Sequence, residues 1–535
     1  MWLKVVKLII LFCLIQPSFL MAQELKVDSV LMDYNVFFKK MDQNFVDEIN
    51  AEEFIVRVKK ATVKQLDPHS HFYTKEESIS RNNAWKGISY AGIGASVKES
   101  TNGVMIEYCK KGYGASEQGL LPGDIIIQID STYCKGLSFK QVISLLRGRN
   151  HSKVQVAVKR GEQKITRTIE RNYIISKSIS FADTISKGIG LIKVDQFLRG
   201  SGEEFRRQVK KVVEKGADKL IIDLRGNVGG LVKETVKALS AVLEEGTLVY
   251  NLKSKDEKSN YSDKTKLRPV NSGMQLVLIV DHKTISSGEI FCGTIQDLDR
   301  GVLIGKKTAG KGIVQGTRYF NDGSSLYITA ARYHLPSGRC IQRTDYSKNY
   351  NSKKTMVIKN DSFESRNGRI LSSGDGITPD LVLDYLATPL AISSAIDKSG
   401  LVFEFAVDVI REYEGDIFKN WKSISKDWIE FLNDNHKRIK LEKHNEFLKF
   451  ETLFQDNKRA NRKIEKLLLD LEKQKLYEIK VNQEVIKSIL YQKLILFTSF
   501  NEGVYQYLSK SDLWIQEAIK ILNSKDTYYQ TLNSN

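Results

Sequence analysis

The spacing of hydrophobic positions changes along the chain, and each change predicts a different kind of structure. From Ser29 to Leu66 apolar residues recur at helical spacing, which predicts a helical lead-in ending near Asp67-Pro68. Between Gly87 and about Tyr173, short β-branched runs alternate with glycine turns. This second pattern predicts a small, partly open β-barrel with one or two helices, among them Ser138 to Leu146.

From Gly188 to about Asp384 predicted strands and helices alternate, as is typical of an α/β domain. The polar, lysine-rich segment Lys253 to Lys266 is expected to be an exposed insertion. After Leu401, long Lys/Glu-rich amphipathic runs predict a helical region whose role the pattern does not reveal. The expected core strands are Gly190 to Val194, Lys219 to Leu224, Leu276 to Val280 and Val302 to Ile304, and the expected helices are Gly202 to Glu214, Val232 to Glu244 and a segment from Ser286 to about Leu298.

The first residues have the pattern of a secretory signal. Lys4 and Lys7 precede the apolar run Leu8 to Ile15, and the segment closes on small and apolar residues at Ala22. The apolar run is short for a membrane span, so an uncleaved anchor is the weaker interpretation. We therefore expect an exported protein, located in the periplasm or cell envelope.

Composition and charge narrow the class of partner. The 535 residues are 41% hydrophobic and 27% charged, as in folded proteins of several domains, and the net charge is +18. Because the basic residues are scattered, we interpret them as a solvated surface, and export further disfavours nucleic acid as a partner. Association with an anionic envelope surface stays open.

The cysteine and histidine patterns do not indicate a metal. No C-x-x-C pair and no cysteine–histidine metal spacing occurs, so buried free thiols are the default expectation, although a bridge between Cys109 and Cys134 stays open. His69 and His71 form an isolated H-x-H that more often marks a polar turn. The cysteines beyond the signal are Cys109, Cys134, Cys292 and Cys340.

Two glycine- and serine-containing turns are candidates for chemistry. The run Asp223 to Gly230 follows a buried strand, and its glycines can turn backbone N–H groups toward a site as oxyanion donors. Ser286 opens a predicted helix with Glu289 three residues later, which is also a good capping box. A helix N-terminus nevertheless favours a nucleophilic serine, and the N–H of Ser287 is available there.

A lysine supplies the third element. Lys311 lies between glycines and is followed by apolar Ile313 and Val314, a setting in which a desolvated amine would have a lowered pKa. A neutral amine can accept the proton of a serine hydroxyl. Gln315 follows at an even spacing that would place it on the same face of an extended segment, where it could orient the amine. Glycine-flanked lysines are also common on surfaces.

Taken together, these segments resemble the carboxyl-terminal processing proteases, also called tail-specific proteases, which are Ser–Lys endopeptidases with an inserted PDZ domain. The resemblance covers roughly Leu66 to Asp384 and includes the separation of 25 residues between Ser286 and Lys311. It implies a ClpP/crotonase-like α/β core. The further segments that carry it are Leu66 to Ser70, the D-L-R-x-N-x-G-G loop Asp223 to Gly230, Tyr327 to Gln342, Gly374 to Asp380, and the PDZ-like signature Leu120 to Ile126.

The resemblance implies a role for each site residue. Ser286 would be the nucleophile, with Ser287 as a rival, Lys311 the general base and Gln315 its partner. No metal and no organic cofactor would be required. Backbone N–H groups of Gly229 or Gly230, together with that of Ser287, would form the oxyanion hole. The candidate loop for a substrate's C-terminal carboxylate in the PDZ domain consists of Ala91, Gly92, Ile93 and Gly94.

We therefore expect a multidomain α/β protein that works as an exported serine endopeptidase. Its substrates would be proteins or peptides with apolar C-terminal tails, and a second copy of the chain or an adaptor protein stays open as a further partner. A catalytically silent PDZ scaffold is the alternative. The expected parts are a signal peptide (1–22), an N-terminal helical region (23–84), a PDZ domain (85–173), a Ser–Lys protease core (174–398) and a helical C-terminal domain (399–535).

Overall fold

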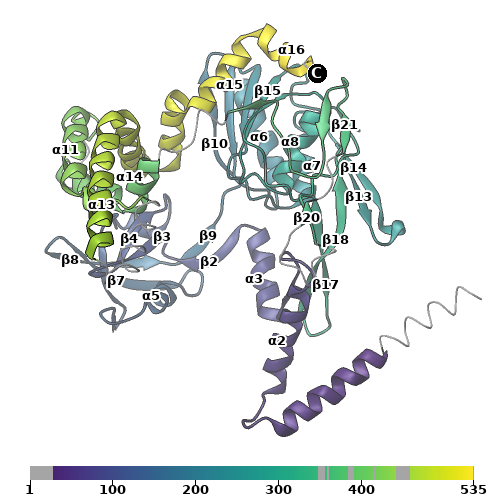
Figure 1. The fold of residues 1–535 in the computed structure, drawn as a ribbon, viewed down its shortest axis with the longest axis horizontal. Coiled ribbons are helices and arrows are strands. Elements are labelled where there is room, and N and C mark those ends of the chain that lie inside the picture. Colours follow the sequence, from purple (N-terminus) through teal and green to yellow (C-terminus); the bar gives the residue numbers. More distant parts are fainter. Residues whose placement is uncertain are drawn as a thin grey trace, which may run out of the picture. The chain divides into compact units, whose positions relative to one another are not determined.

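The fold was taken from a computed structural model, which describes residues 28–346, 356–357, 361–383, 391–413, 417–441 and 458–533 (Figure 1). The predicted signal peptide, residues 1–22, lies outside the described residues. The chain divides into two compact units, which are described separately. The first combines Met1–Thr74 with Thr317–Ile328, and the second combines Lys75–Gly316 with Thr329–Asn535.

The smaller unit contains the predicted helical lead-in, which consists of two helices. Residues 28–44 are helical, and α2 (Ala51–Lys64) begins where the side chain of Asn50 accepts a hydrogen bond from the Glu53 N–H. Beyond α2, the Asp67 carboxylate accepts hydrogen bonds from the His69 and Ser70 N–H groups, which confirms the expected polar turn. Strand β1 (His71–Tyr73) then pairs with the first part of β18 (Ser325–His334).

An antiparallel sheet with one main helix confirms the predicted β-barrel region. The helix α5 (Phe139–Leu146) is capped by the reciprocal pair of Ser138 and Gln141. Strand β3 (Ala95–Ser100) lies at the edge of the sheet, so one side of its backbone is open to an added strand. The strand order is β3, β4 (Gly103–Cys109), β5 (Ile125–Ile129), β7 (Lys153–Arg160) and β8 (Gln163–Glu170).

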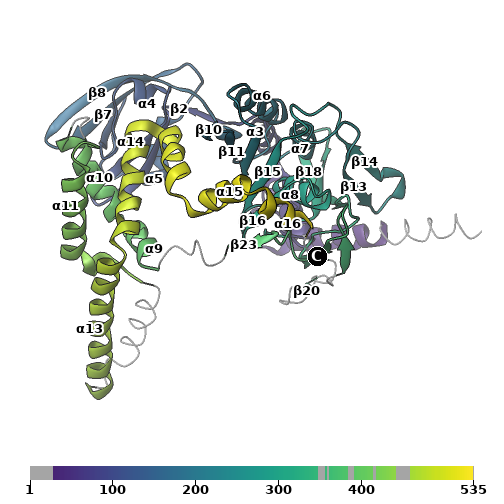
Figure 2. The same cartoon turned by 90° about the horizontal axis from the view of Figure 1, so that it is seen from above.

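The α/β core is built on a six-stranded sheet in which only β10 runs antiparallel to its neighbour. Because neighbouring residues of a strand point to opposite faces, Ile222 and Ile221 enter two different hydrophobic cores. One face packs against α6, α7 and α8, and the other against α15 (Figures 1 and 2).

The bounds of these core elements are close to those predicted, except that α7 ends five residues earlier than expected. The strands in sheet order are β10 (Ile179–Ser186), β11 (Ile189–Val194), β12 (Lys219–Asp223), β15 (Gln275–Val280), β16 (Val302–Gly305) and β23 (Leu381–Val382), and the helices are α6 (Ser201–Glu214), α7 (Val232–Leu239), α8 (Ser287–Asp297) and α15 (Leu513–Asn523).

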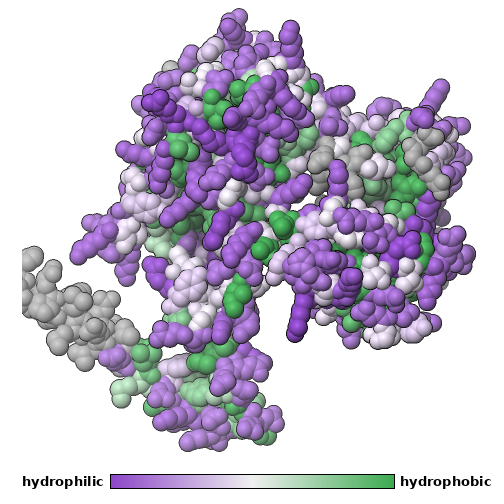
Figure 3. Space-filling view, turned by 180° about the vertical axis from the view of Figure 1, so that it is seen from behind, coloured by the Kyte–Doolittle hydropathy of each residue, from purple (hydrophilic) through white to green (hydrophobic). Residues whose placement is uncertain are grey.

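The lysine-rich insertion is an exposed β-hairpin. Its strands β13 (Leu248–Ser254) and β14 (Tyr261–Lys264) pair with each other, and β13 also pairs with the second part of β18. Most side chains between 253 and 264 are exposed, as predicted. On the face shown in Figure 3, hydrophilic side chains predominate and apolar side chains form small groups.

The C-terminal region is helical, as predicted, and has its own core around the fully buried Trp428. It also contacts the β-barrel domain, because Arg411 donates a hydrogen bond of 3.0 Å to the Gly123 carbonyl and the Lys98 ammonium lies 3.3 Å from the ring centre of Phe403. Within the described residues, no helix has the length and apolar character needed to cross a membrane. The main helices are α9 (Ala391–Lys398), α10 (Leu401–Glu412), α11 (Trp421–Asp434), α13 (Lys458–Val481) and α14 (Gln483–Ser511).

Candidate active site

Three loops of the candidate site follow the carboxyl ends of three neighbouring parallel strands. The glycine-rich loop Asp223 to Gly230 follows β12, the segment leading to Ser286 follows β15, and the segment leading to Lys311 follows β16. Parallel strands present their carboxyl ends at one edge of a sheet, which is where open α/β folds place their sites. The sheet order therefore brings together residues that are far apart in the sequence.

Ser286 has a strained backbone at the start of α8. Its φ of 58° and ψ of −118° lie outside the regions that non-glycine residues normally adopt. Two hydrogen bonds fix this backbone conformation. The Ile285 N–H donates to the Asn227 carbonyl at 3.0 Å, and the Ser286 N–H donates to Glu289 Oε2 at 2.8 Å. Strained residues of this kind concentrate at functional sites, and the side chain of Ser286 is only partly buried.

Glu289 connects the serine and lysine segments. Its Oε2 accepts hydrogen bonds from the backbone N–H groups of Ser286 (2.8 Å) and Lys311 (2.9 Å). Its Oε1 accepts from the Thr308 hydroxyl (2.6 Å) and the Gly310 N–H (2.7 Å). The side chain has no exposed surface, and this burial raises the pKa of Glu289 to about 7, although the four donors lower it. One carboxylate thus fixes the main chain of both candidate catalytic residues.

Tyr333 makes a second connection through the carbonyl groups. Its hydroxyl donates to the Lys311 carbonyl at 2.6 Å and lies 3.3 Å from the Ser286 carbonyl oxygen. The side chain is fully buried, and burial, with a smaller contribution from Glu289, raises its pKa well above the usual value, so the hydroxyl stays protonated. The N–H groups of Ser286 and Lys311 therefore share one side chain, and their carbonyl groups share another.

The predicted contact between Lys311 and Gln315 is present. The Lys311 ammonium nitrogen donates to Gln315 Oε1 at 3.1 Å, and Gln315 Nε2 in turn donates to the Thr329 hydroxyl at 3.2 Å. Lys311 is partly buried, and Ile313 beside it is only 4% exposed. The amide of Gln315 is therefore oriented with its oxygen toward the amine.

The glycine-rich loop approaches Ser286 closely, and its two candidate donors differ. The Gly229 N–H donates to Asn227 Oδ1 at 2.9 Å, so this donor is already used inside the loop. A Cβ atom at Gly229 would lie 3.0 Å from Ser286 Cβ, which explains the need for glycine. Gly230 has a φ of 144°, a conformation that favours glycine, and its carbonyl accepts the Ser287 hydroxyl at 2.9 Å. The Ser287 side chain is buried and hydrogen-bonded to the main chain, whereas Ser286 keeps exposed surface.

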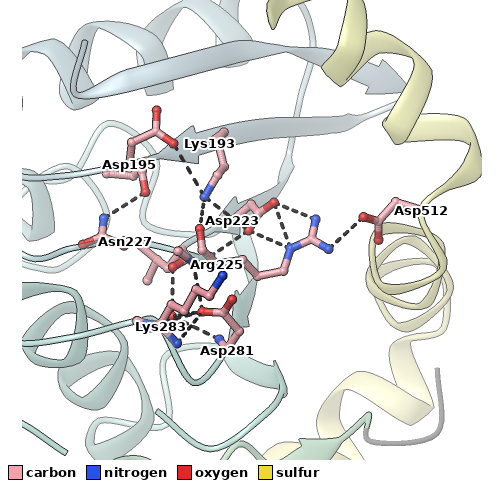
Figure 4. A network of polar contacts seen from close by, with 12 residues as sticks. Lys193, Asp195, Asp223, Arg225, Asn227, Asp281, Lys283 and Asp512 are labelled. Atoms are coloured by element: carbon pink, nitrogen blue, oxygen red, sulfur yellow. Dashed lines mark hydrogen bonds and ion pairs between the residues drawn. The ribbon is translucent and has the colours of Figure 1, made fainter. Parts of the chain in front are cut away.

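A network of charged side chains supports the base of this loop (Figure 4). Asp223 makes a bidentate contact with the Arg225 guanidinium, through Nε to Oδ1 (3.0 Å) and Nη2 to Oδ2 (2.7 Å), and Lys193 donates to the Arg225 carbonyl. The Asp281 carboxylate accepts a hydrogen bond of 2.9 Å from the Gly226 N–H. The loop is thus tied both to β11 and to the segment that leads to Ser286.

The two remaining motifs support the lysine loop. The Thr308 hydroxyl accepts a hydrogen bond of 2.7 Å from the Ile377 N–H, and Arg343 joins the Thr308 carbonyl (3.0 Å) to the Asp375 carboxylate (2.6 Å). Arg343 directly follows the motif Tyr327 to Gln342, and Gln342 within the motif accepts a hydrogen bond of 2.7 Å from the Gly312 N–H. This motif and Gly374 to Asp380 therefore hold the main chain near Lys311.

Sequence reasoning missed the roles of Glu289, Tyr333 and Asn227. The sequence predicted Glu289 only as a helix-capping residue, and its contact with the Ser286 N–H is one of the four hydrogen bonds that its carboxylate accepts. A carboxylate within the otherwise apolar start of α8 was the available signal, because buried charges are rarely kept without several partners. Asn227 belongs to the D-L-R-x-N-x-G-G loop and Tyr333 to the segment Tyr327 to Gln342, but neither motif indicates which main-chain groups these side chains bind.

The candidate carboxylate loop of the β-barrel domain, Ala91 to Gly94, is buried and well ordered by hydrogen bonds. Its carbonyl groups at 91, 93 and 94 accept from N–H groups elsewhere in the domain. Gly94 has a φ of 80°, and a Cβ there would lie 2.1 Å from Tyr113 Cβ, so only glycine fits. The Arg147 guanidinium stacks on Tyr90, 3.9 Å from its ring centre, and this ring lies against Gly92.

The described residues include histidine, cysteine and acidic side chains, which are the usual ligands of metal ions. They contain no group of three or more His, Cys, Asp or Glu side chains arranged to hold a metal ion. The four cysteines among the described residues are free, and Cys109, Cys134 and Cys292 are buried. Burial raises the pKa of the Cys109 thiol to about 12, which makes it a poor nucleophile.

Comparisons with known proteins agree with this architecture. Residues 188–352 match peptidase family S41, residues 105–160 match a PDZ domain, and residues 392–522 match "Probable PDZ-protease, C-terminal helical domain". The chain is 30% identical over 307 residues to the "Probable CtpA-like serine protease" of Staphylococcus aureus strain MRSA252, which covers 57% of this chain and 61% of the relative.

A relative from Staphylococcus haemolyticus with the same description is 29% identical over 305 residues, covering 57% of this chain and 61% of that protein. The chain thus spans about 61% of the length of these curated relatives. The solved photosystem II D1 C-terminal processing protease is 20% identical, with a TM-score of 0.37, and covers 66% of this chain and 88% of that one.

The family models confirm the resemblance and the fold class that the sequence motifs predicted. The core of this chain is therefore a peptidase family S41 domain, joined to a PDZ domain and to a C-terminal helical domain.

Proposed function

We propose that the chain is an exported serine endopeptidase that uses a Ser286–Lys311 dyad and selects substrates by their C-terminal tails. The observation that carries this proposal is the shared support of the two residues. The main-chain N–H groups of Ser286 and Lys311 bind one Glu289 oxygen, and the Lys311 amine bonds to Gln315. The relatives named as CtpA-like serine proteases support the same reaction class.

In this mechanism Ser286 Oγ attacks the carbonyl carbon of the scissile peptide bond while neutral Lys311 accepts the hydroxyl proton. The protonated amine then donates this proton to the leaving amine, which leaves an acyl-enzyme on Ser286. Water, activated by the same lysine, releases the second product. Gln315 acts through Lys311 by orienting its amine.

The oxyanion of the tetrahedral intermediate would be stabilised by the N–H groups of Ser287 and Gly230. Ser287 lies at the N-terminus of α8, where the N–H groups and the helix dipole favour negative charge. We prefer Gly230 to Gly229 because the Gly229 N–H already donates to Asn227. The Ser287 hydroxyl, bonded to the Gly230 carbonyl, would hold the two donors beside each other.

The PDZ domain would capture the substrate's tail as an added strand along β3. The edge position of β3 supports this mode, and the neighbouring Ala91–Gly94 loop would receive the terminal carboxylate. Arg147, stacked on Tyr90 next to that loop, adds positive charge nearby. The substrate class we propose is unfolded or processed protein with an apolar C-terminus.

The dyad is tested by incubating the mature protein with an unfolded substrate that ends in apolar residues. We expect Ser286→Ala to lower turnover by about 10³-fold or more, whereas the matched Ser287→Ala variant should retain more activity because its backbone donor remains. A wild-type protein without activity would instead support the silent PDZ scaffold, whereas an active Ser286→Ala variant would remove Ser286 from the role of nucleophile. A dead Ser287→Ala beside an active Ser286→Ala would reverse the roles of the two serines.

Tail recognition and export need separate tests. Amidation of the substrate's C-terminus should reduce cleavage at low substrate concentration, mainly by weakening binding, and equal cleavage of the free and amidated tails would rule out carboxylate recognition. For export, we propose that the protein functions in the periplasm or cell envelope. N-terminal sequencing of protein from the fractionated envelope should then begin near Gln23, and a cytoplasmic chain retaining Met1 would contradict it.

A further inference from the structure

The glycine-rich loop is held by a residue that lies almost three hundred positions further along the chain. The Arg225 guanidinium contacts the Asp512 carboxylate, with Nη1 and Oδ2 separated by 2.7 Å (Figure 4). Asp512 is the residue immediately before α15, within the segment that matches the C-terminal helical domain. No motif in the chain indicated that this domain reaches the candidate active site.

The two oxygens of Asp512 have separate partners. Oδ1 caps α15 by accepting hydrogen bonds from the Trp514 N–H (2.9 Å) and the Ile515 N–H (3.1 Å). Oδ2 accepts the hydrogen bond from the Arg225 guanidinium. The capping role and the ion pair can therefore be separated by substitution, because an asparagine keeps the capping oxygen and loses the charge.

The ion pair is shielded enough to be strong. The side chains of Arg225 and Asp512 are 21% and 15% exposed, and that of Asp223 is 1% exposed. Arg225 thus lies between two carboxylates, and its guanidinium also lies 5.4 Å from the ring centre of Trp514. The contact with Asp223 is fork-like, the contact with Asp512 is single, and charged contacts partly removed from water fix position more firmly than exposed pairs do.

The α15 helix is anchored independently of the ion pair. Its apolar side chains pack on the face of the core sheet formed by residues such as Ile221, Val277 and Ile279. This burial brings Asp512 to the sheet edge where the glycine-rich loop begins. The anchoring side chains, each at most 4% exposed, are Trp514, Ile515, Ala518, Ile521 and Leu522.

We propose that Asp512 is a positioning residue for proteolysis, which acts by holding Arg225 and, through it, the loop that carries the Gly230 oxyanion donor. The chain of contacts is short. Asp512 and Asp223 hold the side chain of Arg225 from two sides, while Lys193 and Asp281 hold the main chain at Arg225 and Gly226. The proposal rests on the proposed function, because it assumes that the loop supplies an oxyanion donor to a reaction at Ser286.

The experiment is steady-state kinetics of Asp512→Asn in the full mature chain with a peptide substrate. A misplaced donor weakens contacts made in the transition state, so kcat should fall by about 10-fold while KM changes by less than about 2-fold. This is smaller than the roughly 10²- to 10³-fold loss expected for complete removal of an oxyanion donor. Inhibition by a peptide boronic acid, whose tetrahedral adduct needs the same donors, should weaken in parallel.

Two further variants make the outcome decisive. Asp512→Glu keeps the charge and should recover part of kcat, and it replaces Asp512→Asn as the test if the latter fails to fold. Asp183→Asn is the matched control, since Asp183 also pairs with a lysine (Lys215, 2.5 Å) that joins two core elements, on β10 and at the end of α6. We expect Asp183→Asn to leave kcat unchanged.

The failure of this inference can be told apart from failure of the proposed function. If Ser286→Ala is inactive and Asp512→Asn has wild-type kcat and boronate inhibition, the positioning role is wrong and the dyad stands. An equal loss of kcat in Asp183→Asn, or a fall that follows only the melting temperature, would also overturn it. If Ser286→Ala retains activity, the proposed function itself fails.

Discussion

The sharpest test of the site's architecture is removal of the Tyr333 hydroxyl. In Tyr333→Phe the ring keeps its place in the core, but the Lys311 carbonyl loses its donor at 2.6 Å and the Ser286 carbonyl loses a neighbour at 3.3 Å. Because the Ser286 carbonyl also accepts bonds from the Glu289 and Ile290 N–H groups, the main effect should fall on Lys311. The substitution therefore loosens the proposed base without touching its side chain.

The size of the effect follows from burial. A buried acceptor that loses its donor costs about 1–3 kcal/mol, and Tyr333 has no exposed surface, so the free energy of unfolding should fall by about 2 kcal/mol. The rate effect has a different origin. A shift of about 1 Å in a reacting group costs up to about 10²-fold, and a partial shift of Lys311 should lower kcat by about 10-fold with little change in KM.

Tyr250 supplies the matched control. It is only 1% exposed, and its hydroxyl lies 3.0 Å from the hydroxyl of Tyr261 and 3.4 Å from Asp263 Oδ2, both on β14. Tyr250→Phe should lower the free energy of unfolding by about 1 kcal/mol, since Tyr261 is partly exposed and can bond to water. Urea unfolding and peptide cleavage would be measured on both variants. Equal kcat for Tyr333→Phe and Tyr250→Phe would refute the role of Tyr333 in positioning Lys311.

Three further predictions address the same site. The folded-state pKa of Glu289 is raised from 4.5 to about 7, so its contribution to stability is present below pH 4.5 and is lost as the pH rises through 7. In urea titrations, the difference in free energy of unfolding between Glu289→Gln and wild type should therefore change by about 3 kcal/mol between pH 4.5 and 8. A difference that stays constant over this range would contradict the raised pKa. Gly230→Ala would place a Cβ 2.2 Å from the Phe197 carbonyl oxygen, whereas the Cβ of Gly226→Ala would meet no atom within 4 Å. The melting temperature and kcat of Gly230→Ala should therefore be well below those of Gly226→Ala. Similar losses in both variants would show that this close contact does not matter. Lys311→Arg should be inactive and wild-type activity should rise with pH as the amine loses its proton, whereas an active arginine variant would remove lysine from the role of base.

The elements of the core were predicted well from the sequence because their periodicity is strong. The run at 276–280 is continuously apolar, and the run at 219–224 has an apolar centre, Leu220 to Ile222; such runs are typical of parallel strands buried on both faces, and both are strands in the structure. The helix bounds were less accurate where amphipathic character continues past the last hydrogen-bonded turn, as at the end of α7.

The placement of the C-terminal helices was not predictable from the chain. Leu513–Asn523 has the pattern of one more amphipathic helix, and nothing in this pattern tells whether its apolar face covers other helices or the core sheet. In the structure it covers the sheet face that α6, α7 and α8 leave open. This packing, and not a motif, is what brings Asp512 to Arg225.

Glu289 and Tyr333 escaped prediction for a related reason, since they bind main-chain groups that every residue carries. These contacts also bear on the chemistry of Glu289, whose raised pKa would suit a general base. Both of its oxygens are occupied by donors, four in all, and its side chain is fully buried, so it cannot reach a substrate hydroxyl or water. Lys311 carries an amine on a partly exposed side chain, oriented by Gln315, and has the geometry that Glu289 lacks. The same contacts by which Glu289 fixes the main chain of both segments thus argue against it as the base and favour the proposed role of Lys311.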